Sequence, residues 1–256
     1  MTSAAAGAGD GALLRTQGLA KAFGGVRAVD GVDFSLESGE LRCIIGPNGA
    51  GKSTFFKLLL GSIKPDKGTI LFRGRDVTRA EPHRRAHMGI GVKFQHLGVY
   101  GDLTVRHNMQ LPLQHSLSGE AMDAEIARLL ERLNLAGTEE RRVAELAHGQ
   151  RQWLAIGMAL AMQPVLLLLD EPTAGMGPEE TRATGALVHS LHEEGVTIVV
   201  VEHDMAFVRQ LGAPVTVLHY GRVFAEGSLA AIEGNEDVRN IYLGATRTMA
   251  VRKRRH

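Results

Sequence analysis

The most constraining feature of this sequence is one glycine-rich segment, Gly46-Pro47-Asn48-Gly49-Ala50-Gly51-Lys52-Ser53-Thr54. It satisfies the pattern G-x-x-x-x-G-K-[ST], with an apolar run before it and helical apolar spacing after it. Glycines let successive backbone N–H groups turn toward phosphate oxygens, and the helix N-terminus adds a partial positive charge. We therefore expect Lys52 to reach the β- and γ-phosphates of a nucleotide, and Ser53 to place its hydroxyl on Mg²⁺.

Two acidic residues follow a second strongly apolar run. Val165–Leu169 has the composition of a strand buried on both faces, and Asp170 and Glu171 come directly after it. Carboxylates at the C-terminal edge of a parallel strand lie where α/β sheets bind ligands. Alone, the pair could equally be a plain strand end. Beside a phosphate loop, we expect Asp170 to hold Mg²⁺ and Glu171 to act as general base.

A histidine follows a third apolar run. Thr197–Val201 leads into Glu202, His203 and Asp204. A lone histidine is more often structural than catalytic, but this one belongs at the same sheet edge as Asp170. We expect His203 to donate to the γ-phosphate or to orient the attacking water.

The character of the sequence changes along the chain. Residues 1–12 are rich in Ala and Gly, show no secretory signal, and are expected to form a flexible leader. Short alternating stretches from residue 13 to about 34 predict an antiparallel β-region. Helical periodicity dominates residues 98–163, whereas the later apolar runs each follow a helical segment, as in a parallel α/β sheet. Residues 246–256 form a basic tail, either a solvated terminus or a contact with anionic lipid or a partner.

Composition excludes several classes of function. The formal net charge is +1, so no overall field recruits nucleic acid or membrane. The aliphatic runs fall far short of the roughly 20 residues that span a bilayer, so any transport role needs membrane-spanning partners. The single cysteine, Cys43, lies in the apolar run before the phosphate loop and is expected to be a buried hydrophobe in a reducing compartment.

A further segment, Leu146-Ala147-His148-Gly149-Gln150, lies between the phosphate loop and Asp170 and opens a helical stretch. With the motifs above, in this order, it resembles the nucleotide-binding subunits of ABC transporters, whose signature is usually written LSGGQ. The resemblance covers residues 13–245 and implies a single ABC ATPase domain of the α/β class. Its expected parts are a RecA-like P-loop NTPase core, an antiparallel β-subdomain and an α-helical subdomain inserted at about residues 98–163.

The resemblance also implies ATP and Mg²⁺ as cofactors and assigns further roles. It implies that Gln95 contacts Mg²⁺ and water and that Phe23 stacks on adenine, although Phe23 could equally belong to the core. It implies that the signature residues bind the ATP held by a second subunit; these residues are Ala147, His148, Gly149 and Gln150. The residues implied to bind ATP in the same chain are Phe23, Gly46, Pro47, Asn48, Gly49, Ala50, Gly51, Lys52, Ser53, Thr54, Gln95 and Asp170. Those implied to act in catalysis are Glu171, His203, Gln95 and Lys52.

Two positions depart from the family pattern. Ala147 stands where the signature usually has Ser, so a hydroxyl contact to the γ-phosphate is missing and backbone N–H groups must carry more of that contact. In the segment Thr173–Glu179, which corresponds to the D-loop, Gly177 stands where many members have a polar residue. The cross-dimer hydrogen bond of that loop is therefore in question.

The chain end points to a subfamily. The stretches Asn235–Val238 and Ile241–Gly244 are similar to importers of branched-chain amino acids and of urea or short amides. Two other stretches, His148–Trp153 and Ala174–Met176, look closest to the urea-type member. The resemblance thus implies an ATPase subunit that energises such an importer, peripheral to the cytoplasmic face of the inner membrane. Its implied partners are transmembrane permease subunits, a second ATPase subunit in a homo- or heterodimer and, indirectly, a solute-binding protein, with no nucleic acid.

Other functions stay open at this point. One is the ATPase of a lipid or lipopolysaccharide exporter, against which the C-terminal ending argues. Another is a soluble ABC ATPase of translation or DNA repair, which usually carries two such domains or a long coiled-coil insertion. A P-loop kinase or GTPase leaves the signature segment unexplained.

Overall fold

The secondary structure follows the apolar pattern of the sequence closely. The computed structural model describes residues 11–94 and 98–241. Its strands are β1 (Ala12–Phe23), β2 (Val26–Glu37), β3 (Leu41–Ile45), β4 (Lys67–Phe72), β5 (Arg75–Asp76), β6 (Ile90–Lys93), β7 (Leu166–Asp170), β8 (Thr197–Val201), β9 (Val215–His219) and β10 (Arg222–Gly227). Its helices are α1 (Lys52–Leu60), α2 (Pro82–His87), α3 (Val105–Leu113), α4 (Gly119–Arg132), the short 3₁₀ helix Val143–Glu145, α5 (His148–Leu160), α6 (Pro178–Glu193), α7 (Met205–Leu211) and α8 (Leu229–Gly234).

The first sheet is antiparallel, as expected for the N-terminal region. Its order is β2-β1-β4-β5, and β1 pairs antiparallel with both β2 and β4. The strand β2 runs through Gly31 because one extra residue between Val29 and Val32 forms a bulge opposite Leu19–Lys21. Strand β1 already begins at Ala12, the last residue of the predicted leader. Residues 1–10 of that leader lie outside the described part.

The second sheet carries the strands that lead into the acidic and histidine motifs. Its order is β10-β9-β3-β8-β7-β6, and the pairs from β9 to β6 are parallel. Strand β7 is buried on both faces: Leu166 and Leu168 pack with the first sheet and α1, while Leu167 and Leu169 pack with the other helices. This two-sided burial explains the continuous apolar runs. Strands β9 and β10 form an antiparallel hairpin at the other edge of this sheet.

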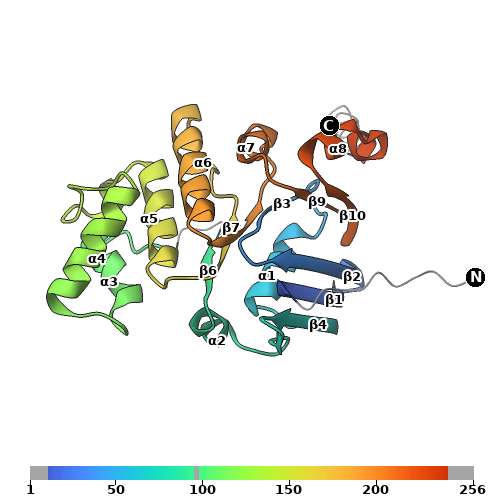
Figure 1. The fold of residues 1–256 in the computed structure, drawn as a ribbon, viewed down its shortest axis with the longest axis horizontal. Coiled ribbons are helices and arrows are strands. Elements are labelled where there is room, and N and C mark those ends of the chain that lie inside the picture. Colours follow the sequence, from blue (N-terminus) through green and yellow to red (C-terminus); the bar gives the residue numbers. More distant parts are fainter. Residues whose placement is uncertain (1–10, 95–97, 242–256) are drawn as a thin grey trace, which may run out of the picture.

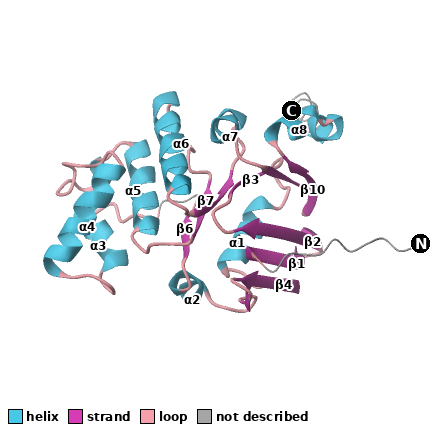
Figure 2. Ribbon diagram, viewed as in Figure 1, coloured by secondary structure: helices cyan, strands magenta, loops and turns pink. Residues whose placement is uncertain are grey.

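The helical region lies at one side of the second sheet. In Figure 1, α3, α4 and α5 stand together beyond β6, whereas β1, β2 and β4 lie at the opposite side of the molecule. Figure 2 shows the same separation of these three helices from β1, β2 and β4. Helix α5 contacts α3, α4 and β6. The predicted fold class is therefore confirmed, and the boundaries of the inserted subdomain, about 98–163, stay a prediction.

Three predicted features fall outside the described residues. They are Gln95, the basic tail at 246–256 and the last part of the chain ending, from Tyr242 onward. Over the residues that are described, no helix combines the length and the apolarity that crossing a membrane requires.

Candidate nucleotide-binding site

The glycine-rich segment connects the buried strand β3 to helix α1, as the sequence predicted. Its helix starts at Lys52, and Gly51 caps it in the left-handed region with φ 101°. Ser53 is exposed in the first turn, where N–H groups have no intrahelical acceptor. The rest of the predicted segment surrounds this helix start, with Asn48 and Gly49 exposed, Pro47 and Thr54 half-buried, and Gly46 and Ala50 buried. These N–H groups and the helix dipole make the turn suitable for an anion.

Two glycines of the loop are required by close approach of other backbone. A Cβ on Gly51 would lie 2.2 Å from the carbonyl oxygen of Ala28, and one on Gly46 would lie 2.3 Å from that of Leu218. Both residues also have positive φ. Gly49, at φ +81°, would meet no atom within 4 Å. The loop is thus held against the β2 and β9 segments on either side of it, while its tip stays open.

Lys52 is folded back onto its own loop. Its ammonium donates to the carbonyl oxygens of Gly46 at 2.6 Å and Pro47 at 3.2 Å. Burial lowers the pKa of Lys52, and the charges of Glu171 and Asp170 oppose that shift. The ammonium of Lys52 therefore lies within the electrostatic field of both predicted acidic residues.

The acidic pair lies at the C-terminal end of β7. Burial, together with the neighbouring charge of Glu171, raises the pKa of Asp170 to about 6. Glu171 leaves the strand in a left-handed conformation, with φ 45°, and its N–H donates to the carbonyl of Val201 at 2.9 Å. This conformation is uncommon for residues other than Gly, Asn and Asp, and it often accompanies functional sites.

His203 meets Glu171 across the edge of the sheet. Its Nδ1 lies 3.2 Å from Oε1 of Glu171, and the imidazole is otherwise exposed. Because β8 is the direct neighbour of β7, the residues after the two strands come to the same edge. The phosphate loop follows β3, the neighbour of β8 on its other side. The topology therefore brings together three motifs that are far apart in sequence.

Glu202 is a residue whose role sequence reasoning did not identify. It is 1% exposed, and its Oε1 accepts a 2.6 Å bond from the hydroxyl of Thr173. Its Oε2 accepts from the backbone N–H of His203 at 2.9 Å and of Asp204 at 3.2 Å. Glu202 thus holds the loops after β7 and β8 together. A glutamate directly after an apolar run was the only signal in the sequence.

Lys93, at the end of β6, was also missed. Its ammonium donates to the carbonyl oxygens of Asp170 at 3.1 Å and Glu171 at 3.0 Å, and its exposure is 1%. Burial lowers the pKa of Lys93 to about 8, against the raising effect of Asp170, Glu202 and Glu171. A lysine within an apolar strand is rarely buried without a partner, and this could have marked it. It fixes the backbone that carries the acidic pair.

The signature segment begins helix α5. Ala147 precedes the helix, and its N–H donates to the side-chain oxygen of Gln150 at 3.1 Å. This is half of a capping box, because alanine has no hydroxyl to return the bond. Ala147 and His148 are exposed, while Gly149 is buried against Glu180, whose Oε1 would lie 2.1 Å from a Cβ there. The exposed N-terminus of α5 therefore presents backbone N–H groups to solvent.

Phe23 ends strand β1 and half of its surface is exposed, so it does not belong to the core. Lys21 places its ammonium 5.5 Å from the ring centroid. An exposed aromatic ring with a cation above it remains available for stacking on a planar group. Gln95 lies outside the described residues.

The residues present suit a nucleotide with Mg²⁺. The hydroxyl of Ser53 and the carboxylate of Asp170 are hard oxygen donors, which Mg²⁺ prefers. Within the described residues, no cluster of three or more His, Cys, Asp and Glu could hold a metal by itself.

Comparison with known proteins decides the family. A family model described as "ABC transporter" matches residues 29–174, more than half of the chain. The chain belongs to the ABC transporter family. A nucleotide-free ATP-binding cassette from an ABC transporter superposes with a TM-score of 0.84 at 30% identity, covering 90% of this chain and 98% of that one. A dimeric bacterial ABC transporter cassette gives a TM-score of 0.78 at 28% identity over 84% and 98%.

Curated relatives within the ABC transporter family have different lengths. The chain is 38% identical to the ribose import ATP-binding protein RbsA 1 of Rubrobacter xylanophilus, over 91% of this chain and 47% of that protein. It is 40% identical to the sulfate/thiosulfate import protein CysA of Mycobacterium tuberculosis, over 81% and 59%. It is 36% identical to the branched-chain amino acid transport protein LivG of Escherichia coli, over 91% and 98%. The chain thus spans about half of the first relative and nearly all of the third.

Proposed function

We propose that this chain binds ATP with Mg²⁺ and hydrolyses it to energise an ABC importer. The observation that carries the proposal is the meeting of the phosphate loop, the Asp170–Glu171 pair and His203 at one edge of the sheet, after three neighbouring strands. A phosphate cradle, a metal-binding carboxylate and a base held beside a histidine are the parts that attack of water on a γ-phosphate requires.

Each residue has a defined part in this proposal. The loop N–H groups and Lys52 hold the β- and γ-phosphates, and Ser53 and Asp170 hold Mg²⁺. The metal ion neutralises charge on the phosphates when it is bound. Glu171 accepts the proton of the attacking water, and His203 orients that water or donates to the γ-phosphate. Lys52 must leave its carbonyl partners, Gly46 and Pro47, to reach the phosphates.

A second cassette completes the site in this proposal. The turn Ala147–Gln150 of one subunit covers the ATP held by the other. Since Ala147 has no hydroxyl, the contact falls to the N–H groups at the start of α5 and to the helix dipole. Phe23 stacks on adenine from the subunit that holds the phosphates, and Gln95 contacts Mg²⁺ and water.

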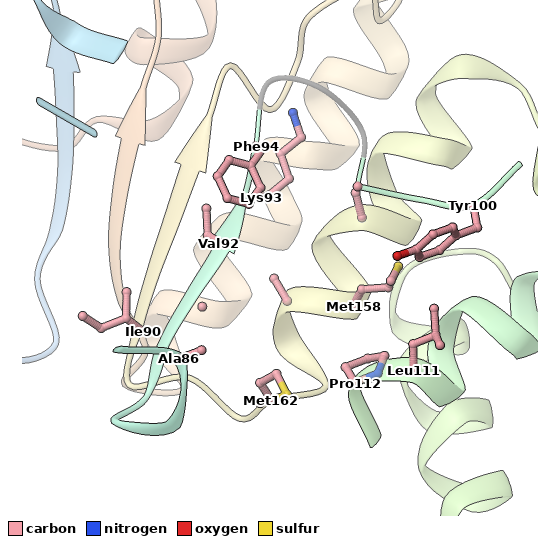
Figure 3. Close-up of a pocket in the computed structure, with 14 residues that line it drawn as sticks. Ala86, Ile90, Val92, Lys93, Phe94, Tyr100, Leu111, Pro112, Met158 and Met162 are labelled. Carbon is pink, nitrogen blue, oxygen red and sulfur yellow. The ribbon is translucent and has the colours of Figure 1, made fainter. Parts of the chain in front are cut away.

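An apolar groove between the sheet and the helical region supports docking on a permease. It has a volume of about 400 Å³ and lies between β6, α3 and α5. Figure 3 shows Phe94 at its upper end, Tyr100 across from it, Met158 on α5 and Met162 just after the end of that helix. Phe94, Tyr100 and Met162 are large side chains with exposures of 44%, 59% and 37%. We propose that an amphipathic helix of the transmembrane permease occupies this groove, which places the chain peripherally at the cytoplasmic face of the membrane.

The proposed solute class is branched-chain amino acids, or urea and short amides. The relative named for branched-chain amino acid transport matches this chain along 98% of its own length, whereas those named for ribose and sulfate import are longer. The stretches His148–Trp153 and Ala174–Met176 favour the urea-type member. A solute-binding protein, acting through the permease, would select the solute.

Two variants test the ATPase. Glu171→Gln keeps the shape of the side chain but removes the base, so ATP binding should persist, turnover should fall by at least about 100-fold, and closed dimers should accumulate. Lys52→Ala should weaken ATP binding itself. Phosphate release, equilibrium ATP binding and light scattering measure these effects. Normal turnover in Glu171→Gln would remove Glu171 as the base, and unchanged affinity in Lys52→Ala would contradict the phosphate-loop assignment.

Purification with partners tests the transport assignment. Tagged protein is recovered from detergent-solubilised membranes of its source, and its partners are identified by mass spectrometry. Permeases together with an amino-acid or amide receptor are the expected result, and that receptor is then titrated with urea and with leucine. Recovery of lipid-export components or ribosomes instead would refute the importer and leave the ATPase chemistry intact.

A further inference from the structure

Two side chains of helix α5 bind one backbone carbonyl in the loop after Glu171. Nε2 of His148 lies 2.9 Å from the oxygen of Ala174, and Nε2 of Gln152 donates to the same oxygen at 3.3 Å. Because a carbonyl oxygen only accepts, Nε2 of His148 must carry the hydrogen in this contact. The signature turn and the loop after the acidic pair are therefore joined within one chain.

The peptide of Ala174 extends this contact to the acidic pair. Its N–H donates to the carbonyl oxygen of Glu171 at 3.3 Å, and Lys93 donates to that carbonyl at 3.0 Å. A continuous series of hydrogen bonds thus runs from His148 and Gln152, through Ala174, to the backbone of Glu171. That backbone is in the uncommon left-handed conformation, so its geometry depends on such support.

Packing alone does not explain why a glutamine occupies position 152. Its exposure is 1%, and its Oε1 has no hydrogen-bond partner among the described residues. A buried amide with an unsatisfied oxygen is less stable than an apolar side chain of the same shape. The hydrogen bond that its Nε2 donates to the carbonyl of Ala174 indicates a positioning role for Gln152 rather than a stabilising one.

The loop is shaped to receive the histidine. Gly175 has φ +75°, and a Cβ there would lie 3.0 Å from Nε2 of His148. The neighbouring indole N–H of Trp153 donates to the hydroxyl of Thr184 at 2.9 Å, which holds α5 against α6 without involving Ala174. Two stretches that stood out together in the sequence therefore contact each other in the folded chain: His148–Trp153 and Ala174–Met176.

We propose that His148 and Gln152 are positioning residues that couple the signature turn to Glu171 of the same chain. The coupling rests on the proposed function, in which this turn contacts the ATP held by a second subunit. When the turn contacts that ATP, His148 and Gln152 fix the position of Ala174. Ala174 in turn fixes the backbone of Glu171, which acts on the ATP bound by its own chain. ATP binding at one site of the dimer then promotes hydrolysis at the other site. The rate of hydrolysis therefore depends cooperatively on the ATP concentration.

Four single variants of the protein and the double variant Gln152→Met with His148→Leu, each purified with its membrane partners, test the coupling. Gln152→Met keeps length and removes the donor, and His148→Leu removes the other donor. His148→Gln replaces it with an amide donor of similar reach, and Trp153→Phe is the control that removes one hydrogen bond from the same helix elsewhere. The measurements are kcat and the Hill coefficient for ATP, the equilibrium affinity for a fluorescent ATP analogue, and the midpoint of thermal unfolding.

The expected pattern separates positioning from stability. Gln152→Met should lower kcat by about tenfold and bring the Hill coefficient to 1, with analogue affinity unchanged and an unfolding midpoint equal to or above that of wild type. His148→Leu should also lower kcat and the Hill coefficient, the double variant should be no worse than the worse single one, and His148→Gln should recover most of kcat. Trp153→Phe should keep the wild-type Hill coefficient.

Two results would overturn the coupling. One is a wild-type kcat and Hill coefficient in Gln152→Met. The other is a loss of kcat that follows a lowered unfolding midpoint, which would make both residues structural. A wild-type protein that neither binds nor hydrolyses ATP is a different result, because it overturns the proposed function and the coupling with it.

Discussion

Nδ1 of His203 lies 3.2 Å from Oε1 of Glu171, although the two residues follow different strands. Nδ1 is also 3.8 Å from Oε2 of Glu202, which holds the His203 backbone N–H at 2.9 Å. The imidazole is therefore fixed at its backbone by one carboxylate and faces a second one at its ring. Among the described residues the other ring nitrogen has no hydrogen-bond partner, so it can act on a water or phosphate oxygen.

Removal of the His203 ring should slow hydrolysis more than binding. In His203→Ala, the water and the γ-phosphate lose their oriented donor, so kcat should fall by about 100-fold while the KM for ATP stays within a few-fold. Steady-state phosphate release checks this. His115→Ala, an exposed position after α3, is the control and should match wild type. A His203→Ala variant with undiminished kcat would exclude the histidine from the reaction.

Lys93 predicts a specific pH dependence of stability. Its folded pKa of about 8 lies below the ordinary 10.5, so between these values the unfolded chain binds more protons and stability rises with pH. Relative to Lys93→Met, wild type should gain up to about 3 kcal/mol in unfolding free energy from pH 7 to pH 10.5. Urea unfolding of both proteins at several pH values measures the difference. A difference that is flat or falls with pH would contradict the buried charge.

Gly51 and Gly49 of the phosphate loop allow a matched comparison of two Gly→Ala substitutions. Gly51→Ala and Gly49→Ala both place a side chain at positive φ, but only the first meets backbone, 2.2 Å from the oxygen of Ala28. Gly51→Ala should therefore lower the thermal unfolding midpoint by at least about 4 °C more than Gly49→Ala does. Calorimetry of the two variants gives the comparison. Equal midpoints would mean that the loop relaxes away from β2 without penalty.

Cys43 should be unreactive in the folded protein. It is fully buried, and burial, with a smaller effect of Glu202, raises the pKa of its thiol to about 12. Little thiolate then exists at pH 8, so iodoacetamide should label it no faster than the chain unfolds. Mass spectrometry after timed labelling tests this, with complete labelling in guanidinium as the control. Rapid labelling in native buffer would place the thiol in an accessible site.

The local hydrophobic pattern of the sequence was enough to predict most strands and helices. The apolar runs before the acidic pair and before His203 predicted β7 and β8 because strands covered on both faces must be continuously apolar. The bulge at Gly31 could not be predicted from the sequence, because a bulge depends on how the partner strand pairs with the extra residue.

The sequence by itself determined the phosphate loop, the acidic pair, the histidine and the signature turn, because each is a local combination of residue types with a chemistry of its own. Only the tertiary structure decided which of them meet. The strand order β3-β8-β7 puts His203 on Glu171, and the packing of α5 on the following loop puts His148 and Gln152 on Ala174. The roles of Lys93 and Glu202 were likewise recognised only from their burial and their contacts in the folded chain. Lys93 donates to the backbone carbonyls of Asp170 and Glu171, and Glu202 accepts from the hydroxyl of Thr173. These partners are far away in the sequence, and pairing between distant segments is set by the packing of the whole chain rather than by any local pattern.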